Sequence, residues 1–95
     1  MEVKVTGGNV KIFGNIKSIG DFQLIKSTID GVVREHRSIT IEIVDSLSMT
    51  SSVIRYLNKL VQSDKINLSL KVGNVQLLAL LDDLKLIHIF KVSRI

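Results

Sequence analysis

The sequence predicts an α/β domain, with a mixed sheet of about five strands and three helices mainly on one face of it. Short segments in which apolar and polar residues alternate are typical of half-buried strands. Longer segments between them have the apolar spacing of amphipathic helices. Because strands and helices follow one another in turn, we expect parallel strands with right-handed crossovers. The second sides of the strands are polar, so we expect that face to be open to water or to a partner.

The N-terminal third of the chain predicts a hairpin followed by a helix. Residues 1–6 and 10–13 alternate, and the Gly-Gly-Asn sequence at 7–9 is a strong turn signal. We expect Asp21 to be the N-cap of the helix. Gly31 inside the helix costs up to about 1 kcal/mol relative to alanine. The expected apolar stripe of the helix is Phe22, Ile25, Ile29 and Val32 or Val33.

The centre of the chain predicts a strand at 38–44, a loop at 45–49 and a helix that starts on the hydroxyl residues 50–52. Isoleucines at alternate positions put one side of the strand in the core, and its other side carries Thr40 and Glu42. The helix is predicted from one apolar face, which consists of Val53, Leu57, Leu60 and Val61.

The C-terminal third predicts a strand at 66–72, a leucine-rich helix at 75–83 and a last strand at 87–92, with residues 93–95 frayed. No linker, repeat or low-complexity segment interrupts the chain. We therefore expect residues 1–95 to form a single domain.

The composition argues against several classes of function. The 13 basic and 9 acidic residues give a net charge of +4, and the basic residues are scattered. Surfaces that bind nucleic acids typically carry a basic stripe with aromatic side chains. The sequence shows no such stripe, so we expect no nucleic-acid partner. Without cysteine there is no disulfide and no thiolate metal site. No apolar run is long enough to span a bilayer and no signal peptide is evident, so we expect a bacterial, cytoplasmic domain without membrane insertion, monomeric or weakly dimeric.

No motif for catalysis is found, and we expect neither a cofactor nor a metal. His36 and His88 lack a nearby cysteine or a spaced histidine partner. The glycines lack the spacing of phosphate-binding loops. Asp82 and Asp83 diverge by about 100° on a helix, which favours a solvated face over a carboxylate dyad. Asp45 either orients a nearby hydroxyl or stabilises its loop. These observations favour a binding module over an enzyme.

The hydroxyl residues Thr50, Ser51 and Ser52 have two interpretations. In the first they only cap the helix, as serine and threonine commonly do. In the second, one of them is phosphorylated, which adds roughly −1.5 to −2 charges. The partial positive charge of a helix N-terminus accommodates such a group. The modification would then leave the fold intact and change what the surface binds.

The order of elements and the strand–loop–helix centre resemble the STAS domain, the fold of bacterial anti-sigma factor antagonists. In that family the central strand ends in Asp-Leu-Ser, and Asp-Ser-Ser-Gly-Leu opens the second helix. The counterparts here are residues 42–44 and 50–54. Gly14 matches the glycine after the family's second strand, and residues 80–86 resemble the stretch before its last strand. The similarity covers roughly residues 3–92.

The resemblance implies that Ser51 is phosphorylated by an anti-sigma factor with serine kinase activity, with Thr50 and Ser52 as alternative acceptors. The unmodified form would bind that partner and release a sigma factor, which is transcription regulation by partner switching. A phosphate would put an unpaired charge in the interface, where burying it is costly. The expected partner-binding residues are Ser48, Met49, Thr50, Ser52, Arg55, Tyr56 and Lys59.

The chain departs from the family's motifs at five positions. Thr50 replaces an acidic residue, and Val53 and Arg55 replace small residues, usually glycine. Lys17 stands where an acidic residue is common, and Lys85 replaces a glycine. Two further hypotheses remain. One is a constitutive, unphosphorylated subunit of a larger complex, such as the STAS modules bound to ABC-type lipid transporters. The other is a small enzyme or ligand carrier.

Overall fold

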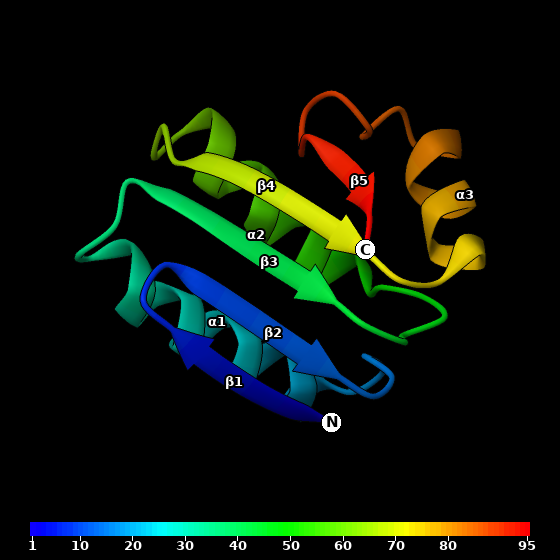
Figure 1. Cartoon of the computed structure of the whole chain (residues 1–95), viewed down its shortest axis with the longest axis horizontal. Helices are drawn as coiled ribbons and strands as arrows, with labels where there is room; N and C mark the ends of the chain where they lie inside the picture. Colours follow the sequence, from blue (N-terminus) through cyan, green and yellow to red (C-terminus); the bar gives the residue numbers. More distant parts are fainter.

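The computed structural model describes all residues from 1 to 95 as one sheet with three helices (Figure 1). The strands are β1 (Glu2–Thr6), β2 (Asn9–Phe13), β3 (Ser38–Ile43), β4 (Asn67–Val72) and β5 (Val92–Arg94). The helices are α1 (Ile19–Val33), α2 (Ser51–Gln62) and α3 (Val75–Asp83). None of the three helices has the length and the apolar run that crossing a bilayer requires.

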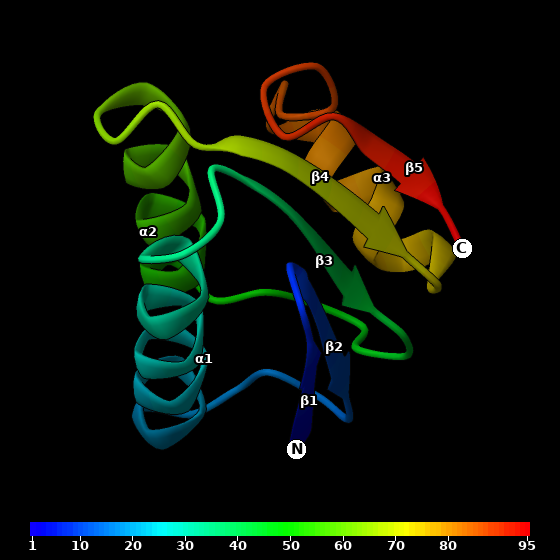
Figure 2. The ribbon, with the colours of Figure 1, turned by 60° about the vertical axis from the view of Figure 1, so that its left-hand side comes forward.

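The sheet has five strands in the order β1-β2-β3-β4-β5. The hairpin β1–β2 is antiparallel, and β2, β3, β4 and β5 are parallel to one another. Each helix therefore joins two neighbouring parallel strands, and each crossover moves in the same direction along the sheet. Such crossovers leave their helices on one side. Figure 2 shows α1 and α2 side by side against one face of the sheet, with α3 behind β4 and β5 in that view. The predicted mixed α/β fold is confirmed.

The core lies between the sheet and the helices. On β3 the residues Ile39, Ile41 and Ile43 are buried, and the residues between them are not. Their register partners on β4 are Leu68, Leu70 and Val72, which are also buried. Along these strands, successive side chains therefore alternate between a buried face and a more exposed face of the sheet. The helices complete the core with Ile25, Ile29, Val53, Leu57, Leu60, Leu77 and Leu81.

Helix α1 begins earlier than the sequence predicts. Its N-cap is Ser18, whose hydroxyl accepts a hydrogen bond from the backbone N–H of Asp21 at 3.0 Å. The carboxylate of Asp21 in turn accepts from the N–H of Ser18 at 3.1 Å, which completes a capping box. Asp21 is thus a first-turn residue and not the cap. The error arose because Ile19 is helical but 77% exposed, so it lies outside the apolar stripe.

The last strand is shorter and later than the sequence predicts. Residues 87–91 form a turn, in which the N–H of Phe90 donates to the carbonyl of Leu86 at 3.0 Å. The strand itself is β5, and it includes residues expected to be frayed. A short apolar run is compatible with both structures, because a buried turn and a buried strand need the same side chains. Phe90 is fully buried and anchors the turn in the core.

Candidate functional site

The carboxyl ends of the parallel strands β2, β3 and β4 meet at one edge of the sheet, which is the right-hand end in Figure 1. Open α/β sheets commonly bind their ligands at this edge. Two loops there are joined by hydrogen bonds between side chain and backbone. The carboxylate of Asp45 accepts from the N–H of Gly14 at 2.6 Å, and the amide oxygen of Asn15 accepts from the N–H of Leu47 at 3.0 Å. Asp45 therefore stabilises its loop.

Ser46 holds the same two loops together from within. It is the buried polar residue of the chain, and its hydroxyl accepts from the N–H of Ile16 at 3.0 Å. The hydroxyl also donates to the carbonyl of Ser48 at 2.7 Å. Both capacities of the hydroxyl are used, so its burial costs little. The sequence contains no signal for this role, because Ile16 lies 30 positions away along the chain.

The loop after β4 approaches the loop after β3 so closely that only glycine fits at position 73. A Cβ on Gly73 would lie 2.0 Å from the carbonyl oxygen of Val44. The N–H of Gly73 donates to the carbonyl of Ile43 at 2.9 Å. The start of α3 is thereby held against the loop that precedes α2.

Helix α2 starts at this edge, and its three hydroxyl residues have different environments. Thr50 is the N-cap, and its hydroxyl accepts from the N–H of Val53 at 3.3 Å. Ser51 is the first residue of the helix and is exposed. Ser52 is half-buried. Of the three, Ser51 is the hydroxyl most accessible to a modifying enzyme, and it is not the cap.

A hollow of about 380 Å³ lies between the starts of α1 and α2. Both helices direct the positive ends of their dipoles to this region, which favours negative charge. One carboxylate already lies nearby, because Asp21 accepts from the N–H groups of Lys17 and Ser18. These hydrogen bonds lower the pKa of the Asp21 carboxyl, and the bond from the N–H of Lys17 has the largest effect. The residues that line the hollow are Lys17, Ser18, Ile19, Phe22, Gln23, Thr50 and Ser52.

Exposed aliphatic side chains lie at the same edge of the sheet as the start of α2. Ile19, after β2, is 77% exposed, and Leu47, after β3, is 50% exposed. Val75, after β4, is 58% exposed. Each side chain follows one of the parallel strands β2, β3 and β4, so all three lie at the same edge of the sheet. Exposed apolar groups gathered at one place are typical of a surface that contacts another protein.

The predicted partner-binding residues divide into surface and core residues. Ser48, Arg55 and Lys59 are exposed, and Thr50 and Ser52 are half-buried. By contrast, Met49 and Tyr56 are each only 6% exposed and belong to the hydrophobic core. Both side chains point into the core, Met49 from the loop before α2 and Tyr56 from the helix itself, so neither is part of the exposed surface on which the partner was expected to bind. Leu47, which the sequence reasoning did not select, is exposed in the same loop.

Tyr56 joins the two helices. Its hydroxyl donates to the carboxylate of Asp30 on α1 at 2.5 Å, and the ammonium of Lys26 lies 5.6 Å from the centre of its ring. Burial, together with the bond to Asp30, raises the pKa of the Tyr56 hydroxyl. Burial alone would raise the pKa of Asp30 too, but hydrogen bonds from Lys26 and Tyr56 outweigh it and lower that pKa. The contact fixes α2 against α1.

No group of three or more His, Cys, Asp or Glu side chains is close enough to hold a metal ion. His36 lines a second hollow on the open face of the sheet, and His88 is exposed in the turn before β5. Asp82 and Asp83 are exposed at the end of α3. The chemistry at the edge of the sheet is therefore that of a surface with an accessible hydroxyl, apolar side chains and basic residues.

Comparison of the chain with protein-family models, with curated proteins and with solved structures finds no match.

Proposed function

We propose that this chain is a protein-interaction module of the STAS type, switched by phosphorylation of Ser51. The observation that carries the proposal is the position of Ser51: it is an exposed first residue of α2, beside the loops that follow three parallel strands. The cap of the helix is made by Thr50. Ser51 is thus free to change its chemical state without the helix losing its cap.

Two backbone conformations support the resemblance to this family. Gly14, at the position of the family's glycine after the second strand, has φ +88°. Lys85, at a position where the family has glycine, has φ +62°. Both angles lie in the left-handed region that glycine adopts most readily. The order of the elements along the chain is the one from which the resemblance was drawn.

The proposed switch acts through charge at the centre of an apolar surface. In the unmodified form, Leu47 and Ile19 are available to a partner on either side of the start of α2. A phosphate on Ser51 adds roughly −1.5 to −2 charges there. The dipole of α2 stabilises the phosphate within the folded chain. A partner that covers this surface would have to bury the charge, and its affinity would fall.

The basic residues nearby indicate the chemistry of the partner. Arg55 and Lys59 are exposed along α2, and Lys17 lies at the hollow between the two helix starts. A partner with apolar side chains surrounded by acidic ones fits this surface. The same acidic groups would repel a phosphate. A cytoplasmic anti-sigma factor with serine kinase activity is the partner that we propose, and transcription is the process that it would regulate.

A constitutive subunit of a larger complex, such as an ABC-type lipid transporter, is the second candidate. The observation that favours it is the replacement of the acidic motif residue by Thr50, whose hydroxyl is engaged with Val53. A carboxylate that could assist phosphoryl transfer is therefore missing next to Ser51. In this case the same surface would bind its partner permanently.

Phosphate mapping tests the proposal. The chain is isolated from the cells that produce it, and its phosphorylated residues are identified by mass spectrometry. We expect a phosphate on Ser51 in part of the population and none in the Ser51→Ala variant. A chain that never carries phosphate, under growth and stress conditions alike, contradicts the switch and favours the constitutive subunit.

A further inference from the structure

The face of the sheet that is turned to the viewer in Figure 1 carries no helix. On it, the register of the strands places side chains in rows that run across the sheet. One row is neutral and polar, with Thr6, Asn9, Thr40 and Ser69 in register on β1 to β4. The next row is mainly basic, with Lys4, Lys11, Glu42 and Lys71 in register. Because the lysines are far apart in the sequence, the row forms only when the strands pair.

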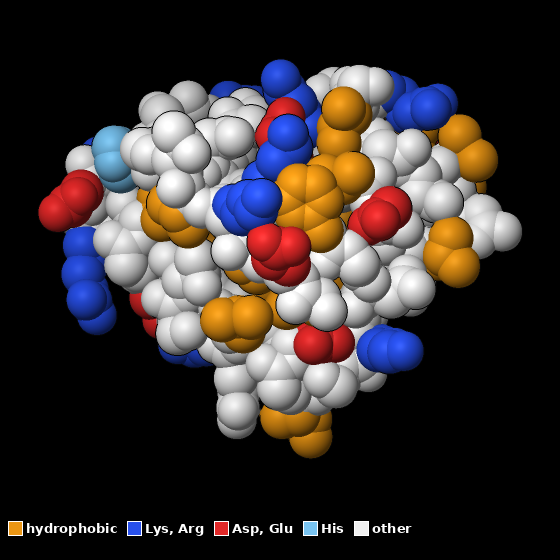
Figure 3. Space-filling view, turned by 60° about the horizontal axis from the view of Figure 1, so that its bottom comes forward, with side chains coloured by type: hydrophobic (Ala, Val, Ile, Leu, Met, Phe, Trp, Pro, Cys, Tyr) orange, Lys and Arg blue, Asp and Glu red, His pale blue; other side chains and the backbone are white.

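An aromatic ring lies beside the basic row. Phe13 is half-exposed at the end of β2, with the ammonium groups of Lys4 and Lys11 at 5.6 Å and 5.9 Å from its centre. Lys4 and Lys11 are direct cross-strand partners, and like charges in that position destabilise a sheet. Figure 3, in which the β1 side of the molecule is turned toward the viewer, shows apolar side chains exposed among basic and acidic ones. The arrangement costs folding energy and leaves both cations at the ring.

The carboxylates on this face neutralise the lysines only in part. Glu2 lies 3.7 Å from Lys4, and Glu42 lies 3.8 Å from Lys11. The exposed pair of Glu2 and Lys4 contributes little to stability, and Glu42 is the less exposed partner of the second pair. A further cation approaches from the turn before β5, where Lys91 donates to the amide oxygen of Asn67 at 2.5 Å.

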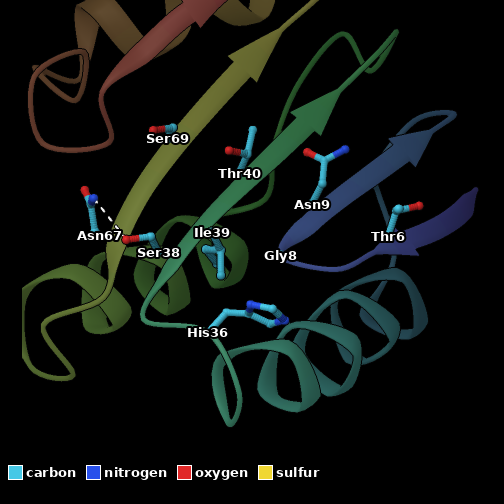
Figure 4. Close-up of a pocket in the computed structure, with 9 residues that line it drawn as sticks. All are labelled: Thr6, Gly8, Asn9, His36, Ser38, Ile39, Thr40, Asn67 and Ser69. Atoms are coloured by element: carbon cyan, nitrogen blue, oxygen red, sulfur yellow. Dashed lines mark hydrogen bonds between the residues drawn. The ribbon is translucent and has the colours of Figure 1, made fainter.

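The neutral row borders a hollow of about 390 Å³. Figure 4 shows its hydroxyl, amide and imidazole groups, which come from four strands and from the segment before β3. The side-chain amide of Asn67 donates to the hydroxyl of Ser38 at 3.2 Å, so one wall is pre-organised. The lining residues are Thr6, Gly8, Asn9, His36, Ser38, Ile39, Thr40, Asn67 and Ser69. Hydrogen-bond donors and acceptors are therefore both present, next to the basic row.

We infer that this open face binds single-stranded RNA. A base stacks on Phe13, the lysines pair with phosphates, and the hydroxyl and amide groups of the hollow contact base edges and ribose 2′-hydroxyls. An acidic peptide would satisfy the lysines but would use neither the ring nor the hollow. The span from Lys4 to Lys71 is three strand spacings, about 14 Å, which suits a few nucleotides. The scattered lysines did not predict this partner, because only the sheet brings them together.

The test measures how a fluorescent U-rich RNA of about ten nucleotides binds to the full chain. Fluorescence anisotropy gives the affinity at several salt concentrations. Each phosphate that a lysine neutralises contributes about −0.7 to the slope of log affinity against log salt. We expect a slope of about −2 to −3, since four lysines face the ligand. The absence of binding at about 50 mM salt overturns the inference.

Matched variants identify the surface. Phe13→Leu keeps an apolar side chain but removes the ring, and we expect at least about fivefold weaker binding, whereas Phe13→Tyr binds like the wild type. The pair Lys4→Gln and Lys11→Gln lowers the size of the salt slope by about 1.4. The control pair is Lys26→Gln and Lys59→Gln, which removes the same charge from the helices and leaves affinity within about twofold. If the two double variants lose the same amount of RNA affinity, the proposed site is wrong.

Two further results separate this inference from its rivals. A single-stranded DNA of the same sequence should bind more weakly, and equal affinity overturns the assignment to RNA. An acidic peptide that binds equally to the wild type and to Phe13→Leu would assign the face to an acidic protein. Ser51→Asp should leave RNA affinity unchanged, because Ser51 lies on α2 and not on the open face. The inference therefore stands or falls independently of the proposed switch.

Discussion

The hydroxyl of Thr50 accepts a hydrogen bond from the backbone N–H of Val53 at 3.3 Å, so the cap of α2 is one residue before Ser51. This contact divides two roles that the three adjacent hydroxyl residues could share. Thr50 stabilises the start of the helix, and Ser51 is exposed on it. The division makes the two roles separable by substitution.

Thr50→Ala should therefore destabilise the chain more than Ser51→Ala. Loss of an N-cap hydroxyl costs about 0.5–2 kcal/mol, and an exposed serine outside the cap typically costs within about 0.5 kcal/mol. Urea denaturation of both variants measures the difference in the free energy of unfolding. If Ser51→Ala costs as much as Thr50→Ala, the cap is shared, and Ser51 has a structural role.

Gly31→Ala should stabilise the chain. Gly31 lies within α1, and a Cβ at this position meets no atom within 4 Å. Alanine in a helix interior is favoured over glycine by about 0.5–1 kcal/mol. Gly73→Ala is the opposite case, because its Cβ would lie 2.0 Å from a carbonyl oxygen. Thermal denaturation should show a higher midpoint for the first variant and a lower one for the second; the reverse order would contradict the described packing.

Tyr56→Phe should weaken the contact between α1 and α2. It removes the hydrogen bond from the Tyr56 hydroxyl to the carboxylate of Asp30. Bonds to charged groups contribute about 1.5–3 kcal/mol, and partial exposure of Asp30 places the expected loss near the lower end of that range. Denaturant unfolding at neutral pH measures it.

The same pair predicts a pH dependence. The pKa of Asp30 is lowered in the folded chain from its ordinary value of 3.8. A carboxyl with a lowered pKa stabilises the fold above its unfolded pKa, and this stabilisation is lost as the pH falls through the folded pKa. The stability difference between wild type and Tyr56→Phe should therefore be constant at neutral pH and shrink below about pH 3.8. A difference that grows in acid would show that another group is responsible.

The sequence predicted the fold because its strongest patterns are local. The alternation of Ile39, Ile41 and Ile43 predicts a strand with one buried face, whichever strands lie next to it. Residues that act through distant contacts left no such pattern. From the sequence, Ser46 resembles any loop serine. In the structure it is buried, and its hydroxyl accepts a hydrogen bond from the N–H of Ile16, which is 30 positions away.

The candidate site was predicted in part. Ser51 lies on the surface as expected, because a helix start at a sheet edge is exposed. The burial of Tyr56 was not predicted because spacing along a helix does not show which face meets α1. The burial of Met49 was not predicted because the loop before α2 has no periodic pattern. The basic row of the open face was missed entirely, because register across the strands determines it.

The most direct test of the central claim compares partner capture by four forms of the chain. They are the wild type, Ser51→Ala, Ser51→Asp and the control Ser27→Asp, which adds the same charge to an exposed position of α1. Each form is immobilised and incubated with an extract of the source cells, and retained proteins are identified by mass spectrometry. Intact-mass measurement of the chain detects phosphorylation as an increase of about 80 Da.

We expect a serine kinase to be retained by the wild type, Ser51→Ala and Ser27→Asp and lost with Ser51→Asp. A fraction of the wild type, but not of Ser51→Ala, should gain the mass of one phosphate. If all four forms retain the same partner and none is phosphorylated, Ser51 is not a switch, and the chain is a constitutive subunit.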